Sequence, residues 1–204
     1  MSPFARRAGA FSFGTLIWIG AAACGKGSDA SDSAAADTGA AAMSPTEQAP
    51  ASTALNDAQI AHIVVTANSI DSAAGVVAKA KGQSKAVKDF AQTMITDHSG
   101  VNQQATSLAT TLGVTPEDNG TSQSLSAGAA ESAATLQGMT GANFDRAYID
   151  REVGYHEAVL DALDKTLVPS AQNAELKALM VKVRPAFVAH LEHARRLQTS
   201  LAAK

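Results

Sequence analysis

The feature that most constrains the fold is a helical spacing of apolar residues that runs through four long stretches of the chain. Apolar residues recur every three or four positions in residues 56–81, 84–112, 141–168 and from about 173 to 202. Each stretch would have one apolar face as a helix, and such a helix is stabilised mainly by burying that face against other helices. No segment shows the sustained alternation of apolar and polar residues that is typical of strands. The sequence therefore predicts an all-α fold, a bundle of four long helices.

Boundary signals agree with this division. Asn56 begins a sequence with the form of a capping box, and Ser84 is placed to cap the second helix. Pro169 is expected to end the third helix and Pro185 to kink or interrupt the fourth, because proline lacks a backbone N–H. Between the second and third long helices, a weaker pattern predicts a short extra helix over about residues 125–137.

Each of the four apolar faces carries a polar residue near its middle. These residues are Asp71, His98, His156 and His190. In an up-and-down bundle with short connections, the middles of the helices lie at about the same height, so these side chains are expected to meet. Imidazole and carboxylate groups bind Zn, Cu, Fe and Ni. The set therefore predicts a core site for one transition-metal ion, with His98, His156 and His190 as ligands and Asp71 as a fourth.

A row of polar residues leads to His156 on the third helix. The row consists of Asp145, Tyr148, Glu152 and His156. Spacings of three and four residues place its members on one helical face. Asp97, Asp145, Tyr148 and Glu152 are interpreted as hydrogen-bond partners that orient the histidines. The alternative is that the same side chains form a structural hydrogen-bonded network without a metal. His62 is expected to be solvated, and His193 to face water or the edge of a groove.

The sequence gives little support for an enzyme. It contains no Gly-x-Ser-x-Gly arrangement and no phosphate-binding loop. It also contains no Glu-x-x-His motif, whereas di-iron carboxylate bundles use two such motifs. A metal-dependent oxidoreductase is therefore the least favoured interpretation.

The N-terminal region predicts export. Arg6 and Arg7 precede a run of apolar and small residues that is too short to span a membrane, which is typical of a signal peptide over residues 1–23. Cys24, the single cysteine, then resembles the lipidated residue of a bacterial lipobox, although Ala21 stands where leucine is favoured. An ordinary signal peptidase site is the alternative. Residues 24–55 are rich in Ala, Ser and Pro and predict a disordered tether, which leaves residues 56–202 for the bundle.

Charge narrows the range of partners. The formal net charge is −3 and becomes more negative when the two arginines leave with the signal peptide. A mildly acidic chain without a basic patch is not expected to bind nucleic acid. The expected partner is a membrane, through a lipid on Cys24, and the sequence indicates no protein partner. The expected location is the periplasmic side of the cell envelope, and Gly25 after Cys24, as in lipoproteins that the chain resembles, favours the outer membrane.

Several motifs together resemble a known family. They are Asp97-His98, the segment 141–148 followed by His156, and Pro185 followed by His190. Over residues 57–201 the chain is similar to an uncharacterised bacterial family, the domain of unknown function 4142. The resemblance implies a ferritin-like four-helix bundle and an exported, often lipid-anchored protein, but no known activity. That family usually has Glu where this chain has Asp71.

Two interpretations of function follow. The first is a non-enzymatic exported lipoprotein whose ferritin-like bundle binds one transition-metal ion. The alternative is an envelope interaction or stress-related protein whose His, Asp and Tyr residues form a structural network.

Overall fold

The computed structural model describes residues 54–203, which form helices and their connections. The elements are α1 (Asp57–Lys81), α2 (Lys85–Thr111), α3 (Gly120–Gln137), α4 (Gly141–Ala162), the π-helical turn η1 (Leu163–Leu167), α5 (Val168–Ser170) and α6 (Ala174–Ala202). No strand occurs within residues 54–203. The predicted fold class, an all-α bundle with an extra helix between the second and third long helices, is therefore confirmed. The predicted signal peptide, Cys24 and all but the last two positions of the predicted tether lie outside the described residues.

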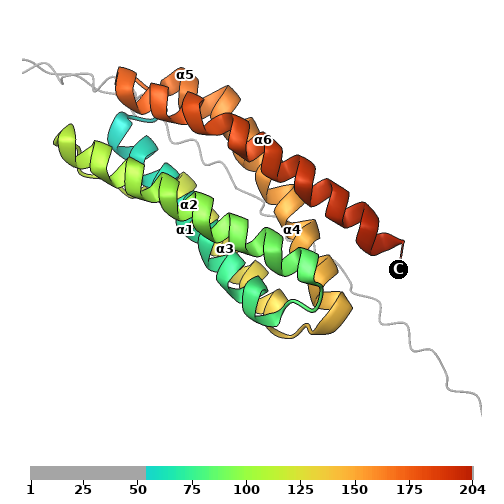
Figure 1. The fold of residues 1–204 in the computed structure, drawn as a ribbon. Coiled ribbons are helices and arrows are strands. Elements are labelled where there is room, and N and C mark those ends of the chain that lie inside the picture. Colours follow the sequence, from blue (N-terminus) through green and yellow to red (C-terminus); the bar gives the residue numbers. More distant parts are fainter. Residues whose placement is uncertain (1–53, 204) are drawn as a thin grey trace, which may run out of the picture. The chain divides into compact units, whose positions relative to one another are not determined.

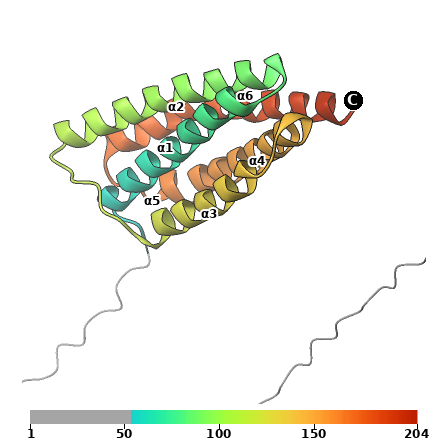
Figure 2. The ribbon, with the colours of Figure 1, turned by 90° about the horizontal axis from the view of Figure 1, so that it is seen from below.

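The long helices are arranged as two antiparallel pairs. α1 and α2 form one pair, joined by the short connection 82–84, and α4 and α6 form the other (Figure 1). Contacts of α2 with α6 and of α1 with α4 bring the two pairs around a common interior. α3 packs along α1 and α4 on one side of this arrangement (Figure 2).

The interior contains two separate apolar clusters. The Phe187 cluster consists of Ile60, Ile63, Val64, Val101, Ala105, Leu163, Leu167, Ala171, Leu176, Leu179, Met180, Val183 and Phe187. The Phe90 cluster consists of Ala78, Val87, Phe90, Ala91, Met94, Leu136, Phe144, Tyr148, Ile149, Ala194, Leu197 and Leu201. Each cluster takes residues from all four long helices or the turn that extends α4, so each spans the bundle.

A polar layer separates the two clusters. On α2, His98 follows Met94 of the Phe90 cluster and precedes Val101 of the Phe187 cluster. Equivalent positions between the clusters are held by Asp71 on α1, His156 on α4 and His190 on α6. Because neighbouring helices run in opposite directions, the middles of all four helices coincide, and the four side chains fall into one layer.

The ends of α1 and α2 show how local sequence sets the helix boundaries. Asn56 and Gln59 form the predicted capping box at the start of α1. Ser84 holds the N-cap position of α2, but among the described residues its side chain makes no capping hydrogen bond. The carboxylate of Asp145 on α4 replaces it, accepting hydrogen bonds from the backbone N–H of Gln83 at 2.8 Å and of Ser84 at 2.7 Å.

Three predicted boundaries differ from the structure. α3 begins at Gly120 rather than near residue 125, because the side chain of Asn119 caps its first turn. Pro169 does not end the third long helix, which continues through η1 to Ser170. Proline is tolerated there because the π-helical turn directly before it changes the hydrogen-bond pattern, with the N–H of Val168 donating to the carbonyl of Leu163. α6 is not interrupted at Pro185. Because proline has no backbone N–H, the carbonyl of Val181, one turn earlier, lacks its helical donor. Val181 is half-exposed and lies on the solvent side of α6.

Close contact between α1 and α2 depends on Gly75. A Cβ at this buried position would lie 2.9 Å from the carbonyl oxygen of Ala91 and 3.0 Å from Cγ1 of Ile95. We expect Gly75→Ala to lower the free energy of unfolding by about 1–3 kcal/mol, because the two backbones must separate. Urea denaturation measures this change.

Gly154→Ala is the matched control, since no heavy atom of the described residues lies within 4 Å of a Cβ at this exposed helical position. It should raise the free energy of unfolding by about 0.5–1 kcal/mol through helix propensity. Equal effects of the two substitutions would contradict the close packing of α1 on α2.

Candidate metal centre

The structure brings Asp71, His98, His156 and His190 together in the buried layer. Each has a relative exposure of 5% or less. The centroids of the three imidazole rings lie 5.3–5.5 Å apart in every pair. Each of the three histidines offers one ring nitrogen, and these nitrogens lie within 4.8 Å of one another. The three nitrogens therefore lie close enough together for a single ion to bind all of them.

One nitrogen of each ring is held by an oxygen of the surrounding helices. Nδ1 of His98 lies 2.8 Å from the amide oxygen of Asn68, and the amide nitrogen of Asn68 in turn donates to the carbonyl of Val64. Nδ1 of His156 lies 3.0 Å from the backbone carbonyl of Glu152. Carbonyl and amide oxygens only accept hydrogen bonds, so both ring nitrogens must donate.

His190 is held through Nε2, whereas His98 and His156 are held through Nδ1. Its Nε2 lies 2.9 Å from a carboxylate oxygen of Asp97, which lies at the partly exposed edge of the layer. Nε2 of His190 therefore carries the proton, and Nδ1 is its other ring nitrogen. Asp97 thus makes the orienting contact expected of it from the sequence.

The remaining nitrogens have lone pairs and no donor. Within residues 54–203, Nε2 of His98, Nε2 of His156 and Nδ1 of His190 are buried without a hydrogen-bond partner. Each is the nitrogen that carries the lone pair when its ring is neutral, because the opposite nitrogen donates the hydrogen bond. Oδ2 of Asp71 and Oε2 of Glu152 lack a partner in the same part of the chain. The layer therefore contains a group of possible electron-pair donors that face one another, with Nε2 of His98 and Oδ2 of Asp71 2.8 Å apart.

Asp71 is the carboxylate at the centre of this group. Its Oδ2 lies 2.8 Å from Nε2 of His98 and 3.6 Å from Nε2 of His156. Its Oδ1 accepts a hydrogen bond from Nη1 of Arg151 at 2.7 Å. Asp71 thus has one oxygen toward the histidines and the other toward a basic side chain.

Glu152 lies in the layer itself rather than behind it. Its side chain is fully buried, with Oε1 accepting a hydrogen bond from Nη1 of Arg151 and Oε2 lying 3.6 Å from Nδ1 of His156. Asp71, Glu152 and His156 form a second group whose ligand atoms lie within 4.8 Å of one another. The sequence-based assignment of Glu152 to an orienting role therefore leaves out its position as a possible ligand.

Burial and charge set the protonation of the layer. Burial lowers the pKa of His156 to about 4 and also lowers the pKa of His190, so both rings are neutral at pH 7. Burial alone would raise the pKa of Asp71, but the contact with His98 and the charges of His98, His156 and Arg151 hold it well below its usual range. Burial and then the charge of Asp71 raise the pKa of Glu152 well above its usual range. At pH 7 the layer thus holds the charge of Asp71 beside the neutral rings of His156 and His190.

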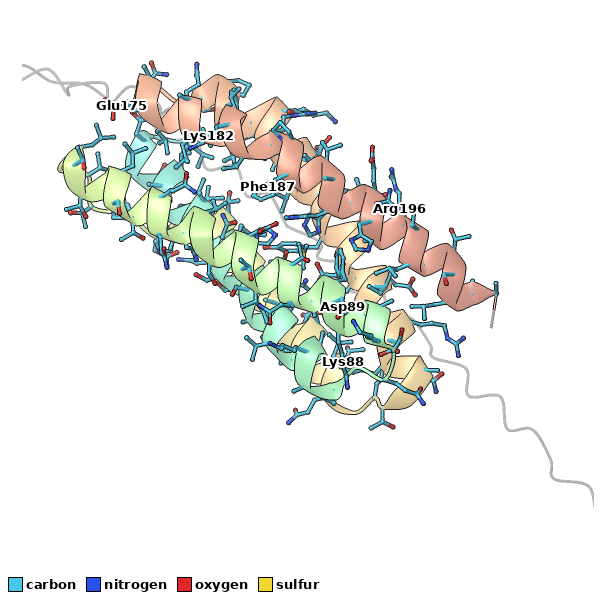
Figure 3. All side chains as sticks on the ribbon, in the orientation of Figure 1. Lys88, Asp89, Glu175, Lys182, Phe187 and Arg196 are labelled. Atoms are coloured by element: carbon cyan, nitrogen blue, oxygen red, sulfur yellow. The ribbon has the colours of Figure 1, made fainter. Side chains whose placement is uncertain are left out.

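Aromatic rings close the layer on both sides. Phe187 of α6 points into the interior (Figure 3) and stacks on His98 with ring centroids 5.1 Å apart and an interplanar angle of 10°. On the other side, Tyr148 packs between Phe90 and Phe144 at centroid distances of 6.3 Å. Burial, followed by the charges of Glu152 and Asp71, raises the pKa of the Tyr148 phenol, which keeps it protonated. Such apolar walls strengthen electrostatic interactions within the layer.

The structure places three other sequence candidates outside the layer. Asp145, expected to orient the histidines, instead caps the start of α2 with both carboxylate oxygens. The row of polar residues on α4 spans more than two helical turns, so Asp145, its first residue, lies too far along α4 from His156 to reach the polar layer. His62 lies near the N-terminal end of α1, where its Nδ1 is 3.8 Å from Oδ1 of Asp118. His193 packs edge-on against Phe90 at 5.1 Å and is half-buried.

Sequence reasoning missed Asn68, Arg151 and Phe187 as parts of the site. Asn68 precedes Asp71 by one helical turn, so a second polar residue on the same face was a signal that could have found it. Phe187 and His190 are likewise one turn apart on α6. Arg151 gave no such signal, because a basic residue in an amphipathic helix usually lies in solvent.

The role of Asp145 can be tested through stability. Asp145→Asn removes the carboxylate charge and replaces one of the two accepting oxygens with an NH₂ group. One of the backbone N–H groups of Gln83 and Ser84 then faces another donor. We expect Asp145→Asn to lower the free energy of unfolding by about 1–3 kcal/mol, as measured by urea denaturation. The control is Asp150→Asn, since Asp150 is exposed and pairs only with the side-chain amide of Gln198 in the described contacts. An Asp145 variant as stable as the Asp150 variant would show that the cap contributes little.

Comparison with known proteins gives the chain a family but no function. The family model described as a domain of unknown function (DUF4142) matches residues 42–197. No curated protein matches the chain, and no solved structure matches it. The match extends over most of the sequence and includes every residue of the polar layer, and it confirms the resemblance seen in the motifs. The chain therefore belongs to the DUF4142 family, the proteins that share this domain of unknown function.

Proposed function

We propose that this protein is a non-enzymatic, exported lipoprotein whose helical bundle binds one transition-metal ion. The ligands are Nε2 of His98, Nε2 of His156 and Nδ1 of His190, with Oδ2 of Asp71 as the fourth. The observation that carries the proposal is the convergence of these four buried atoms. Nε2 of His156 and Nδ1 of His190 have no hydrogen-bond partner within residues 54–203, and Nε2 of His98 and Oδ2 of Asp71 have only each other, at 2.8 Å.

Energetics favour a cation in the layer. Each buried polar atom without a partner costs about 1–3 kcal/mol, and several of them together would consume a large part of the stability of a typical domain. A metal ion satisfies the four atoms at once. Ligands bound at 2.0–2.2 Å to one ion lie roughly 3–3.5 Å apart. Oδ2 of Asp71 lies 2.8 Å from Nε2 of His98 and 3.6 Å from Nε2 of His156, so shifts of a few tenths of an ångström bring both pairs into this range.

The ligand types narrow the choice of metal. Three imidazole nitrogens and one carboxylate oxygen suit Zn, Cu, Fe or Ni rather than Mg or Ca, which prefer oxygen ligands only. The surrounding contacts of Asn68, Asp97 and the Glu152 carbonyl fix the three rings, as is usual around metal-bound histidines. Four protein ligands complete a tetrahedral shell, and a site closed in this way is typical of structural rather than catalytic metals. This supports a binding function without turnover.

The competing function is an envelope protein with a metal-free network. The 2.8 Å distance between His98 and Asp71 favours it, because a proton on Nε2 of His98 would make an ion pair there. Such a proton satisfies two atoms and leaves Nε2 of His156 and Nδ1 of His190 without a partner. The metal therefore accounts for more of the layer than the network does.

The proposed function includes a location in the cell envelope. A lipid on Cys24 would hold the bundle at the periplasmic side of the outer membrane, at the end of the tether. The signal peptide and Cys24 support this proposal through their sequence alone.

Metal retention tests the proposed function. The purified protein is exposed to a mixture of Zn²⁺, Cu²⁺, Fe²⁺ and Ni²⁺, washed and measured by elemental analysis. We expect one metal ion to stay with each chain, and His156→Ala to lose it, because this ring is one of the ligands. His62→Ala is the matched control, since His62 lies outside the polar layer, and it should retain the ion.

A second variant separates a metal centre from a network. Asn68→Leu removes the acceptor that orients His98 and should weaken metal affinity by about 10–100-fold without removing a ligand. Asn102→Leu should leave the affinity unchanged, because Asn102 bonds Ser69 at the edge of the α1–α2 contact and touches none of the three histidines in the described contacts. If the wild-type protein keeps no metal and His156→Ala only lowers its melting temperature, the layer is a structural network and the proposal is wrong.

A further inference from the structure

Arg151 holds a positive charge inside the polar layer. Its side chain is only 12% exposed, and its Nη1 lies 2.7 Å from Oδ1 of Asp71 and 2.5 Å from Oε1 of Glu152. The carboxylates of Glu152 and Asp71 raise the pKa of Arg151 despite its burial, so the charge is permanent. One guanidinium nitrogen therefore bridges the two buried carboxylates.

Nη1 of Arg151 lies among side chains that could act as ligands of a second metal ion. Asp71, Glu152 and His156 form a group of possible metal ligands that shares His156 with the group of three histidines. Two members of this second group are the carboxylates that Arg151 bridges. Asp71 has one oxygen toward the histidines and the other toward Arg151, which is the way a carboxylate bridges two cations in two-metal sites, where the ions lie about 3.5–4 Å apart.

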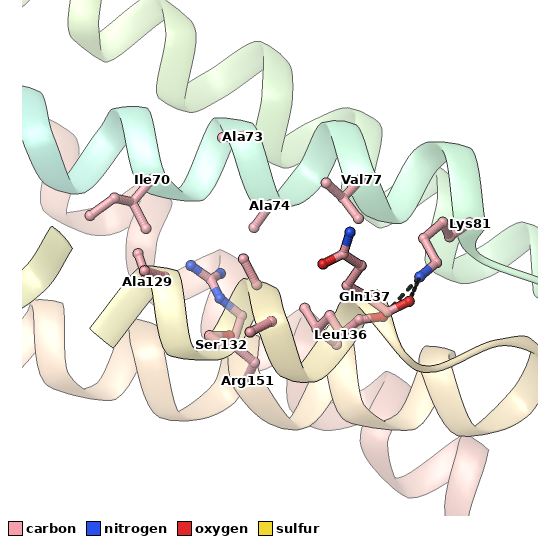
Figure 4. A pocket seen from close by; sticks show the side chains of 13 residues that line it. Ile70, Ala73, Ala74, Val77, Lys81, Ala129, Ser132, Leu136, Gln137 and Arg151 are labelled. Carbon is pink, nitrogen blue, oxygen red and sulfur yellow. Dashed lines mark hydrogen bonds between the residues drawn. The ribbon is translucent and has the colours of Figure 1, made fainter. Parts of the chain in front are cut away.

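The far side of Arg151 faces open space. Arg151 lines a groove of about 710 Å³ between α1 and α3, whose walls are mainly small residues from the two helices. Figure 4 shows the guanidinium of Arg151 reaching from α4 into this groove, with Ile70 and Ala129 beside it. The face of Arg151 also lies over the ring of Tyr155, 4.5 Å from its centroid, which fixes its orientation. Removing the side chain would connect the two carboxylates to water in the groove.

We propose that Arg151 occupies a second cation position and thereby restricts the centre to one metal ion. The guanidinium neutralises Asp71 and Glu152 in place of a metal and closes the groove to water that would complete a second coordination shell. Arg151 is thus a specificity-determining residue of the centre. This inference rests on the proposed function, because it assumes that the three histidines bind the first ion.

Metal stoichiometry tests the inference. Wild-type protein, Arg151→Met and Arg184→Met are equilibrated with Zn²⁺, separated from free metal, and measured by elemental analysis and protein concentration. We expect one Zn²⁺ per chain for the wild type and two for Arg151→Met, because Met leaves the carboxylates unpaired and accessible from the groove. Arg184→Met, which breaks the exposed pair of Arg184 with Asp164, is the control and should bind one.

Failure of the inference is distinguishable from failure of the proposed function. No Zn²⁺ on the wild-type protein, together with no metal retained from the mixture of Zn²⁺, Cu²⁺, Fe²⁺ and Ni²⁺, would overturn the proposed function. One Zn²⁺ on the wild type with one or none on Arg151→Met would leave that function standing and overturn the role of Arg151.

Loss of folding in the variant is also informative. Thermal unfolding is followed by circular dichroism with and without Zn²⁺. If Arg151→Met is less stable than the wild type without metal and Zn²⁺ restores its melting temperature with two ions bound, the metal has replaced the guanidinium, as expected. If it stays unfolded in Zn²⁺ at concentrations that load the wild type, Arg151 is a structural counter-ion and the inference is wrong.

Discussion

The structure depends on one constraint: a layer of buried electron-pair donors must be balanced by positive charge in the middle of an otherwise apolar bundle. Asp71, His98, His156 and His190 each replace an apolar residue on their helix, and the Phe187 and Phe90 clusters pack on the two sides of the layer. Neither cluster is continuous with the other. The four helices are therefore held in register by both apolar contacts and the polar atoms between them, and a cation that satisfies these atoms would stabilise the whole bundle.

Charge in the layer is divided between two places. The histidine rings lie on one side of Asp71, and the guanidinium of Arg151 lies on its other side. The carboxylate of Asp71 thus lies between a site suited to a transition metal and the guanidinium of Arg151. This arrangement favours firm binding of a single ion over the paired ions of di-iron bundles, consistent with the lack of Glu-x-x-His motifs in the sequence. It also explains how Glu152 can be buried beside Asp71 without a second metal.

Much of the fold could be predicted from the sequence, because apolar spacing and caps are local properties. The four long helices and the extra helix follow from that spacing, and antiparallel connections bring Asp71 and the three histidines to one level. The parts that could not be predicted depend on tertiary contacts. Asp145 reaches across to cap α2, and Pro169 is absorbed by a π-helical turn that the sequence does not signal. Arg151 became buried because two carboxylates compensate its charge, which no periodicity reveals.

The most direct test of the central claim is a crystal structure of the Zn²⁺-loaded protein with anomalous data collected on both sides of the zinc absorption edge. The account predicts one anomalous peak, about 2.0–2.2 Å from Nε2 of His98, Nε2 of His156, Nδ1 of His190 and Oδ2 of Asp71. The guanidinium of Arg151 should remain on the far side of Asp71. A layer filled by water or by direct hydrogen bonds between these side chains, with zinc elsewhere or absent, would contradict it.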